Sequence, residues 1–150
     1  MDILLLGRKK DVYSKKLYFF LKKKNHNVNV IWSKDHQDLL KKKINKNYDL
    51  LISFRSYFIL KKKHINLAKI AAINFHPGPP KYRGIGCINK ALLNKEKMYG
   101  TTAHIIDEKI DNGKIIDVEL FKINKSYNLE KLLNHTHKVM LQQSKKILND

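Results

Sequence analysis

The 150-residue sequence contains only one cysteine, Cys87, and only three prolines and six glycines. A single cysteine excludes a disulfide framework and a zinc site made of several thiolates. No stretch approaches the roughly 20 consecutive apolar residues of a membrane span. The short apolar run at the N-terminus is followed, not preceded, by the basic residues Arg8 to Lys10, which is the wrong order for a secretory signal. These absences predict a soluble, cytoplasmic protein with no membrane partner.

Acidic residues are also scarce. Thirteen Asp and Glu stand against 31 Lys and Arg, which gives a formal net charge of +18. A basic domain attracts phosphates at long range, so a nucleic-acid partner is one interpretation. Against it, the aromatic residues are not interleaved with basic ones as in RNA-binding surfaces. We favour the interpretation that the Lys-rich runs are solvated helix faces, with a charge that also suits a phosphorylated small substrate.

Hydrophobic patterning predicts one α/β domain over residues 1–150, with a Rossmann-like, mostly parallel sheet flanked by helices. Strands are expected at 3–6, 28–32, 49–54, 71–76, 101–106 and 114–123. Helices are expected from Asp11 to about Lys24, from Ser33 or Asp35 to about Ile44, from Cys87 to Asn94 and after a cap at Ser126, with a short helix or turn within 61–70. In the last helix the expected inward stripe is Leu129, Leu132, Leu133, Val139, Met140 and Ile147.

All three prolines and three of the six glycines lie between Pro77 and Gly86. The apolar run before this segment predicts a buried strand that ends at Asn74 and His76, whose side chains share one face. The Pro/Gly segment cannot continue a strand, so it predicts a rigid loop above the strand end. An imidazole exchanges protons near neutral pH, and an amide can donate to an oxyanion. The pattern therefore fits acid–base chemistry.

The same residues also fit a purely structural interpretation. Asn74 could bond the Pro/Gly turn, and His76 could be a satisfied strand-end residue. Asp111, which precedes Asn112-Gly113, could form an Asx turn. Cys87 is expected to be buried and inert, although the first turn of a helix could stabilise a thiolate. The histidines at 26, 36, 64, 135 and 137 are given no role, because none has a partner at metal-ligand spacing.

Four motifs in a fixed order decide between these interpretations. They are Asn-x-His-Pro from Asn74, Tyr-Arg-Gly from Tyr82, Gly-x-Thr-x-His from Gly100 and Asp-x-Gly-x-Ile-Ile from Asp111. This set resembles the folate-dependent formyltransferases, a family that includes glycinamide ribonucleotide, methionyl-tRNA and sugar-nucleotide N-formyltransferases. The match covers about residues 48 to 123, and the ordered set is far more specific than any one motif. It implies a fold of the formyltransferase type.

The resemblance implies an N-formyltransferase that moves a formyl group from 10-formyltetrahydrofolate to a primary amine, without a metal. It assigns stabilisation of the tetrahedral oxyanion to Asn74 and to protonated His76. His76 would also carry the proton between the amine and the departing folate nitrogen. Asp111 is carried over as the family's carboxylate, which would favour the protonated imidazole and order a relaying water.

The resemblance also implies binding residues. The folate is expected at the carboxyl ends of the strands, against Arg55, Phe58, Ile59, Leu60, Ile106, Asp107 and Ile110. The amine is expected against Tyr82, Arg83, Gly84 and His104, where the fork of Arg83 suits a phosphate or carboxylate. A structural interpretation stays open at three places. The segment after Arg55 could be a simple strand-to-helix connection, Arg83 could be a surface residue, and His104 could be a wall residue of the site.

Two departures from the family bear on the acceptor. The loop from Gly7 to Asp11 has a single glycine where the purine-pathway enzymes have a glycine-rich loop. Methionyl-tRNA formyltransferases carry a further C-terminal domain beyond the position of Asp150. We therefore expect an amino-sugar nucleotide as acceptor. A homodimer is an open possibility. The alternatives are a methionyl-tRNA or other formyltransferase-like protein that lacks its C-terminal domain, a non-catalytic scaffold, and a basic nucleic-acid-binding domain.

Overall fold

The computed structural model describes residues 1–149 except 39, 41–43, 45 and 109–111. The strands are β1 (Asp2–Arg8), β2 (Asn27–Ser33), β3 (Tyr48–Phe54), β4 (Ala68–His76), β5 (Met98–Ile105) and β6 (Ile115–Lys122). The helices are α1 (Val12–Lys23), α2 (Lys62–Ile65), α3 (Cys87–Leu93) and α4 (Leu129–Leu148). The apolar runs therefore predicted each of these strands to within a few residues. Among the described residues, no helix is long and apolar enough to cross a lipid bilayer.

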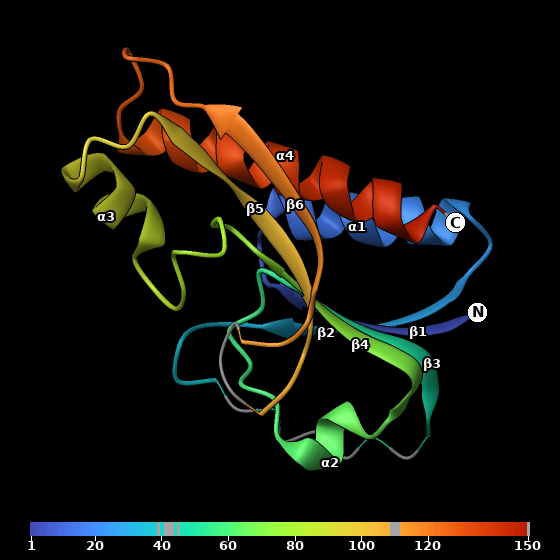
Figure 1. The fold of residues 1–150 in the computed structure, drawn as a ribbon. Coiled ribbons are helices and arrows are strands. Elements are labelled where there is room, and N and C mark those ends of the chain that lie inside the picture. Colours follow the sequence, from blue (N-terminus) through green and yellow to red (C-terminus); the bar gives the residue numbers. More distant parts are fainter. Residues whose placement is uncertain (39, 41–43, 45, 109–111, 150) are drawn as a thin grey trace.

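The described strands form one sheet in the order β2-β1-β3-β4-β5-β6 (Figure 1). The strands from β2 to β4 pair in parallel, and β5 and β6 are antiparallel to their neighbours. The predicted mostly parallel α/β sheet is thus confirmed. The change to antiparallel pairing brings the start of β6, at Ile115, next to His104 of β5, which itself pairs with Asn74 near the carboxyl end of β4.

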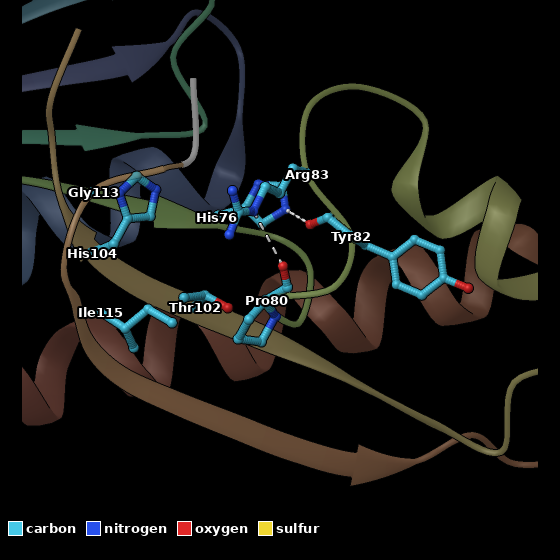
Figure 2. Close-up of a pocket in the computed structure, with 8 residues that line it drawn as sticks. All are labelled: His76, Pro80, Tyr82, Arg83, Thr102, His104, Gly113 and Ile115. Atoms are coloured by element: carbon cyan, nitrogen blue, oxygen red, sulfur yellow. Dashed lines mark hydrogen bonds between the residues drawn. The ribbon is translucent and has the colours of Figure 1, made fainter. Parts of the chain in front are cut away.

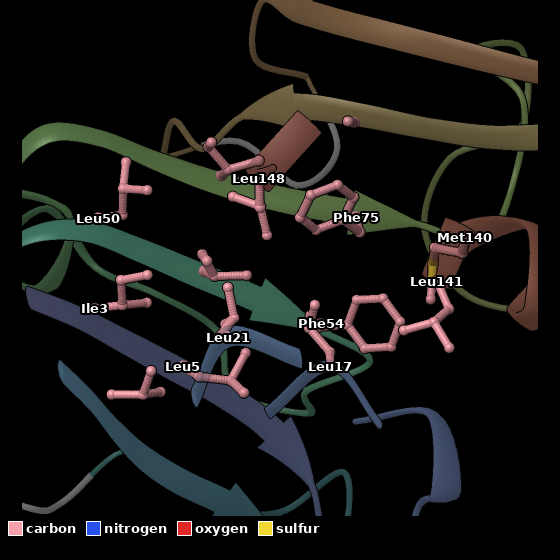
Figure 3. Packing of buried hydrophobic residues seen from close by; sticks show 14 residues of the cluster. Ile3, Leu5, Leu17, Leu21, Leu50, Phe54, Phe75, Met140, Leu141 and Leu148 are labelled. Atoms are coloured by element: carbon pink, nitrogen blue, oxygen red, sulfur yellow. The ribbon is translucent and has the colours of Figure 1, made fainter. Parts of the chain in front are cut away.

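Helices α1 and α4 cover one face of the sheet, and α2 lies on the other (Figure 1). Alternation sends Ile3 and Leu5 of β1 toward α1 and α4, where the larger core lies (Figure 3). Leu4 and Leu6 point the other way, into a smaller cluster with Phe58 and Leu60. Both faces of β1 are apolar because helices and loops cover both sides of a parallel strand.

Helix α4 differs from the prediction in its start and in its buried face. Asn128, not Ser126, is the N-cap, and its side chain accepts from the backbone N–H of Lys131 at 2.9 Å. Leu129 and Leu133 are exposed. The buried face also includes polar residues, namely Thr136, His137, Gln143 and Ser144. Leu132 and Met140 of the predicted stripe are buried as expected. Thr136, Gln143 and Ser144 join them because they form hydrogen bonds inside the protein, which the apolar stripe alone does not predict.

The predicted start of a helix at Ser33 or Asp35 is wrong. Ser33 is the last residue of β2, and residues 35–37 form a bend and a turn. The carboxylate of Asp35 accepts from the N–H of Gln37 at 2.9 Å, and that of Asp38 accepts from Lys34 at 2.8 Å. Such local bonds compete with helix formation. Part of the predicted segment lies outside the described residues.

The pairing of β5 with β6 needs a glycine at position 100. A Cβ there would lie 2.3 Å from the carbonyl oxygen of Glu119, which is a main-chain atom of the neighbouring strand. We expect Gly100→Ala to lower the free energy of unfolding by about 1–3 kcal/mol, measured by urea denaturation. The control Lys122→Ala, at an exposed position of the same ladder, should stay within about 0.5 kcal/mol of wild type. Equal effects of the two substitutions would contradict this account of the pairing.

Candidate active site

Strand β4 delivers Asn74 and His76 at its carboxyl end, as the sequence predicts. Its neighbours Ile73 and Phe75 point into the core under α1 and α4. Alternation therefore turns Asn74 and His76 to the opposite face of the sheet. His76 is 5% exposed, so its ring is part of the interior of the site and not of the surface.

The loop of residues 77–86 is held over the end of β4 by side chains of β5. The hydroxyl of Tyr99 donates to the carbonyl of Pro77 at 2.8 Å, and that of Thr102 donates to the carbonyl of Gly78 at 2.7 Å. The prolines lack a backbone N–H and cannot extend a strand ladder. The loop carbonyls are paired by side-chain hydroxyl groups instead. The loop is thereby fixed above His76.

The ring of His76 is held by this loop. Its Nε2 lies 2.7 Å from the carbonyl oxygen of Tyr82 and 3.8 Å from the sulfur of Cys87 (Figure 2). Because a carbonyl oxygen only accepts, Nε2 must carry the proton. Gly78 leaves room for the ring, since a Cβ at this position would lie 2.7 Å from Nε2.

Asn74 is oriented by His104, which lies beside it on β5. Nδ1 of His104 is 2.9 Å from the carbonyl of Ile105, so this nitrogen donates. Nε2 of His104 then accepts from the side-chain Nδ2 of Asn74 at 3.1 Å. His104 thus orients the Asn74 amide, and its predicted contact with the amine substrate stays a prediction.

His76 and His104 border a hollow of about 40 Å³ (Figure 2). It is lined by His76, Pro80, Tyr82, Arg83, Thr102, His104, Gly113 and Ile115. A hollow of this size holds a formyl group or one to two waters. Gly113 closes its edge, and a Cβ there would lie 1.6 Å from the carbonyl of Ile105. Asp111 and Ile110 lie outside the described residues.

The remaining predicted substrate residues come from the same loop. Arg83 is exposed and donates from Nη1 to the side-chain oxygen of Asn112 at 2.6 Å, which joins the loop to the segment before Gly113. Tyr82 borders the hollow, but its ring points away (Figure 2). Its hydroxyl donates to Glu96 at 2.8 Å. Gly84 is exposed, with a φ of +78°.

The predicted folate residues fall into separate places. Phe58 and Leu60 are buried and pack with Ile106 on the α2 side of the sheet. Ile59 is 69% exposed, and Asp107 is also exposed. Arg55 follows β3 with a φ of +55°, and its guanidinium pairs with the carboxylate of Asp11. Arg55 therefore lies apart from the apolar cluster of Phe58, Leu60 and Ile106.

Comparison with known proteins identifies the family. A model of the formyl transferase family matches residues 4–146, nearly the whole chain. The chain belongs to the formyl transferase family. This confirms the resemblance carried by the four motifs.

The chain is similar to parts of longer methionyl-tRNA formyltransferases. That of Hydrogenobaculum sp. is 31% identical over 109 residues, which cover 72% of this chain and 36% of that protein. That of Thermodesulfovibrio yellowstonii is 37% identical over 92 residues, which cover 61% of this chain and 29% of that protein. The matched region thus spans about a third of the length of these relatives.

Solved structures of formyltransferases share the fold. The formyltransferase PseJ from Anoxybacillus kamchatkensis, in complex with UDP-4,6-dideoxy-4-formamido-L-AltNAc and tetrahydrofolate, has a TM-score of 0.80 at 23% identity, and the match covers 98% of this chain and 74% of that chain. The phosphoribosylglycinamide formyltransferase from Streptococcus pneumoniae has a TM-score of 0.75 at 13% identity, over 99% of this chain and 98% of that chain. At these identities the likeness establishes the fold alone.

This formyl transferase fold contains a second, larger cavity of about 430 Å³ beside Arg55, between α1 and the first half of α4. It is lined by Tyr13, Arg55, Asn128, Glu130, Lys131, Leu133, Asn134 and His137. His137, to which the sequence pattern assigns no role, is among them. Its position in the sequence could have indicated burial, because it lies three residues before Met140 and four before Leu141, on the same face of α4.

Burial, followed by the nearby charge of Arg55, lowers the pKa of His137 to about 3. The folded state therefore binds a proton less readily than the unfolded chain, in which a histidine titrates near 6.5. The contribution of His137 to stability is complete above pH 6.5 and is lost as the pH falls toward 3. We expect the free energy of unfolding to drop over this range by up to about 1.4 kcal/mol per pH unit.

Urea denaturation at a series of pH values checks this expectation. His137→Gln should flatten the pH dependence, because glutamine cannot take up the proton. The exposed His36, changed to Gln, is the matched control and should keep the wild-type dependence. A His137→Gln variant with an unchanged slope would show that the buried imidazole is not the titrating group.

Proposed function

We propose that this protein transfers a formyl group from 10-formyltetrahydrofolate to a primary amine. The observation that carries the proposal is the hollow at the end of β4. His76 lines it and is held by the Tyr82 carbonyl, and Asn74 is bonded to His104, which also lines it. Preorganised donors in a site this small are worth more than in water, because few solvent dipoles compete with them.

The residues present fit the reacting end of this donor. The hollow of about 40 Å³ matches a formyl group, and the apolar cluster of Phe58, Leu60 and Ile106 lies on the same face of the sheet as Asn74. When bound, 10-formyltetrahydrofolate supplies the formyl group. Asn74 then stabilises the charge that develops on the formyl oxygen, and His76 carries the proton of the amine. We assign the partner carboxylate to Asp111.

Removal of either group should abolish most of the activity. We expect Asn74→Ala and His76→Ala each to lower kcat by about 10²- to 10³-fold, since each removes a positioned donor or proton carrier. The measurement is the rate of tetrahydrofolate release with a competent amine. Asn89→Ala and His36→Ala change exposed residues of the same types and should leave kcat unchanged. Wild-type turnover in both site variants would disprove the proposed chemistry.

For the acceptor we propose an amino-sugar nucleotide. The sugar formyltransferases PseJ and WlaRD have TM-scores of 0.80 and 0.82 over 98% and 99% of this chain. The cavity of about 430 Å³ carries Lys131, Glu130 and Arg55 in its ion pair with Asp11, beside hydroxyl and amide groups, which suits a polar, hydroxylated molecule. The single glycine of the segment from Gly7 to Asp11 is needed for packing, because a Cβ at this position would lie 2.6 Å from the ring of Trp32. The homodimer stays a prediction.

Methionyl-tRNA is the second candidate acceptor. The sequence relatives at 31% and 37% identity are methionyl-tRNA formyltransferases. The net charge of +18 also favours a polyanionic partner. Binding to RNA would weaken steeply with salt because it releases counterions, whereas a sugar nucleotide with few charges would respond weakly.

Turnover with a panel of UDP- and dTDP-linked amino sugars, alongside methionyl-tRNA, separates the two acceptors. We expect an amino-sugar nucleotide to be formylated, with a KM that changes little between about 50 and 200 mM salt. We also expect Arg83→Ala to raise that KM while kcat stays near wild type, as for a residue that binds substrate and transition state equally. If only methionyl-tRNA is formylated, with a KM that rises steeply with salt, the acceptor is methionyl-tRNA and not an amino-sugar nucleotide.

A further inference from the structure

One edge of the His76 ring lies against the loop of residues 77–86. Nε2 lies 2.7 Å from the Tyr82 carbonyl oxygen and 3.8 Å from the sulfur of Cys87. A Cβ on Gly78 would lie 2.7 Å from Nε2 and 3.2 Å from Cδ2. The loop therefore covers the edge formed by Cδ2 and Nε2. Nδ1 and Cε1 form the opposite edge.

The contacts of this covered edge fix its protons. Nε2–H donates to Tyr82, because the carbonyl oxygen can only accept. The thiol of Cys87 donates to the carbonyl of Gly84 at 3.3 Å, for the same reason. The sulfur therefore turns its lone pairs toward Nε2–H and has no second proton to give to the ring. In the neutral imidazole the lone pair is then on Nδ1.

Cys87 also acts on the loop itself. It is the first residue of α3 and is 5% exposed. Its bond to Gly84 joins α3 to the loop two residues after Tyr82. Gly84 and Gly86 have φ values of +78° and +76°, and no atom of the described residues lies within 4 Å of a Cβ built on either one. The Cys87–Gly84 contact therefore ties α3 to this part of the loop.

We propose that Cys87 is a positioning residue for formyl transfer. Together with the Tyr82 carbonyl, it holds His76 in the Nε2–H tautomer, so that Nδ1 is the nitrogen that exchanges protons with the reacting amine. This inference rests on the proposed function. Nδ1 accepts the proton of the amine as the amine nitrogen bonds to the formyl carbon. The same proton passes from Nδ1 to the leaving folate nitrogen as its bond to the formyl carbon breaks, and Nε2–H stays bonded to Tyr82 throughout.

Nuclear magnetic resonance reads the tautomer without any ligand. Long-range ¹H–¹⁵N spectra of the uniformly ¹⁵N-labelled full chain distinguish protonated from unprotonated ring nitrogens of each histidine. The His76→Gln variant identifies the signals of His76 by their loss. We expect a single Nε2–H form in the wild-type protein. A wild-type ring protonated at Nδ1 instead would overturn the proposal.

Substitution of Cys87 tests its part. Cys87→Ala should give a mixture of both tautomers and lower kcat by about 3- to 10-fold, the range of one lost hydrogen bond, with the KM for the formyl donor nearly unchanged. Cys87→Ser restores a donor to Gly84 and should recover the Nε2–H form and most of kcat. Asn89→Ala, on the exposed side of α3, is the control for both readouts.

Two results would overturn the role of Cys87. One is an unchanged tautomer and kcat in Cys87→Ala, and the other is a folded Cys87→Ser variant that behaves like Cys87→Ala. Circular dichroism establishes that each variant folds. Because Cys87→Ser exchanges only the sulfur for an oxygen, it is expected to fold even if Cys87→Ala does not, and it can then be tested by itself. Because the ligand-free spectrum reports the tautomer whether or not any amine is formylated, a failure of the proposed function is told apart from a failure of the positioning.

Discussion

The candidate site depends on one constraint, which is that the loop of residues 77–86 folds back over the end of β4. Hydroxyl groups of Tyr99 and Thr102 hold the loop through two of its carbonyls, and the loop in turn brings the Tyr82 carbonyl to 2.7 Å from Nε2 of His76. Proline and glycine serve this in different ways. Proline removes backbone donors that would need partners, and Gly78 leaves the space that the imidazole occupies.

The antiparallel pairing of β5 with β4 supplies the rest of the site. It sets His104 beside Asn74, so the orientation of the amide is decided by strand register and by one backbone carbonyl, that of Ile105. It also brings the chain back past β5 at Gly113, where only a glycine fits. Described residues from all four motifs, namely Asn74 and His76, Tyr82, His104, and Gly113, therefore meet at one corner of the sheet.

Much of this could be predicted from sequence, and the failures have physical causes. Asn74 and His76 were predictable because an apolar run fixes a strand and alternation fixes its faces. The buried face of α4 was only partly predictable. Leu132 and Met140 follow the apolar stripe, but Thr136 and Gln143 are buried with internal hydrogen bonds and depart from it. The part played by Tyr82 was also hidden, since it acts through its backbone carbonyl, about which the side-chain type says nothing.

Calorimetric titration with 5-formyltetrahydrofolate, a stable analogue of the formyl donor, tests most directly whether the loop and His76 form a donor site. The account predicts saturable 1:1 binding by the wild-type chain and by Ile85→Ala, which changes an exposed residue of the same loop. It predicts at least about tenfold weaker binding by Gly78→Ala, since a methyl group at that position displaces the ring of His76. No binding by wild type, or equal affinity of all three proteins, would contradict it.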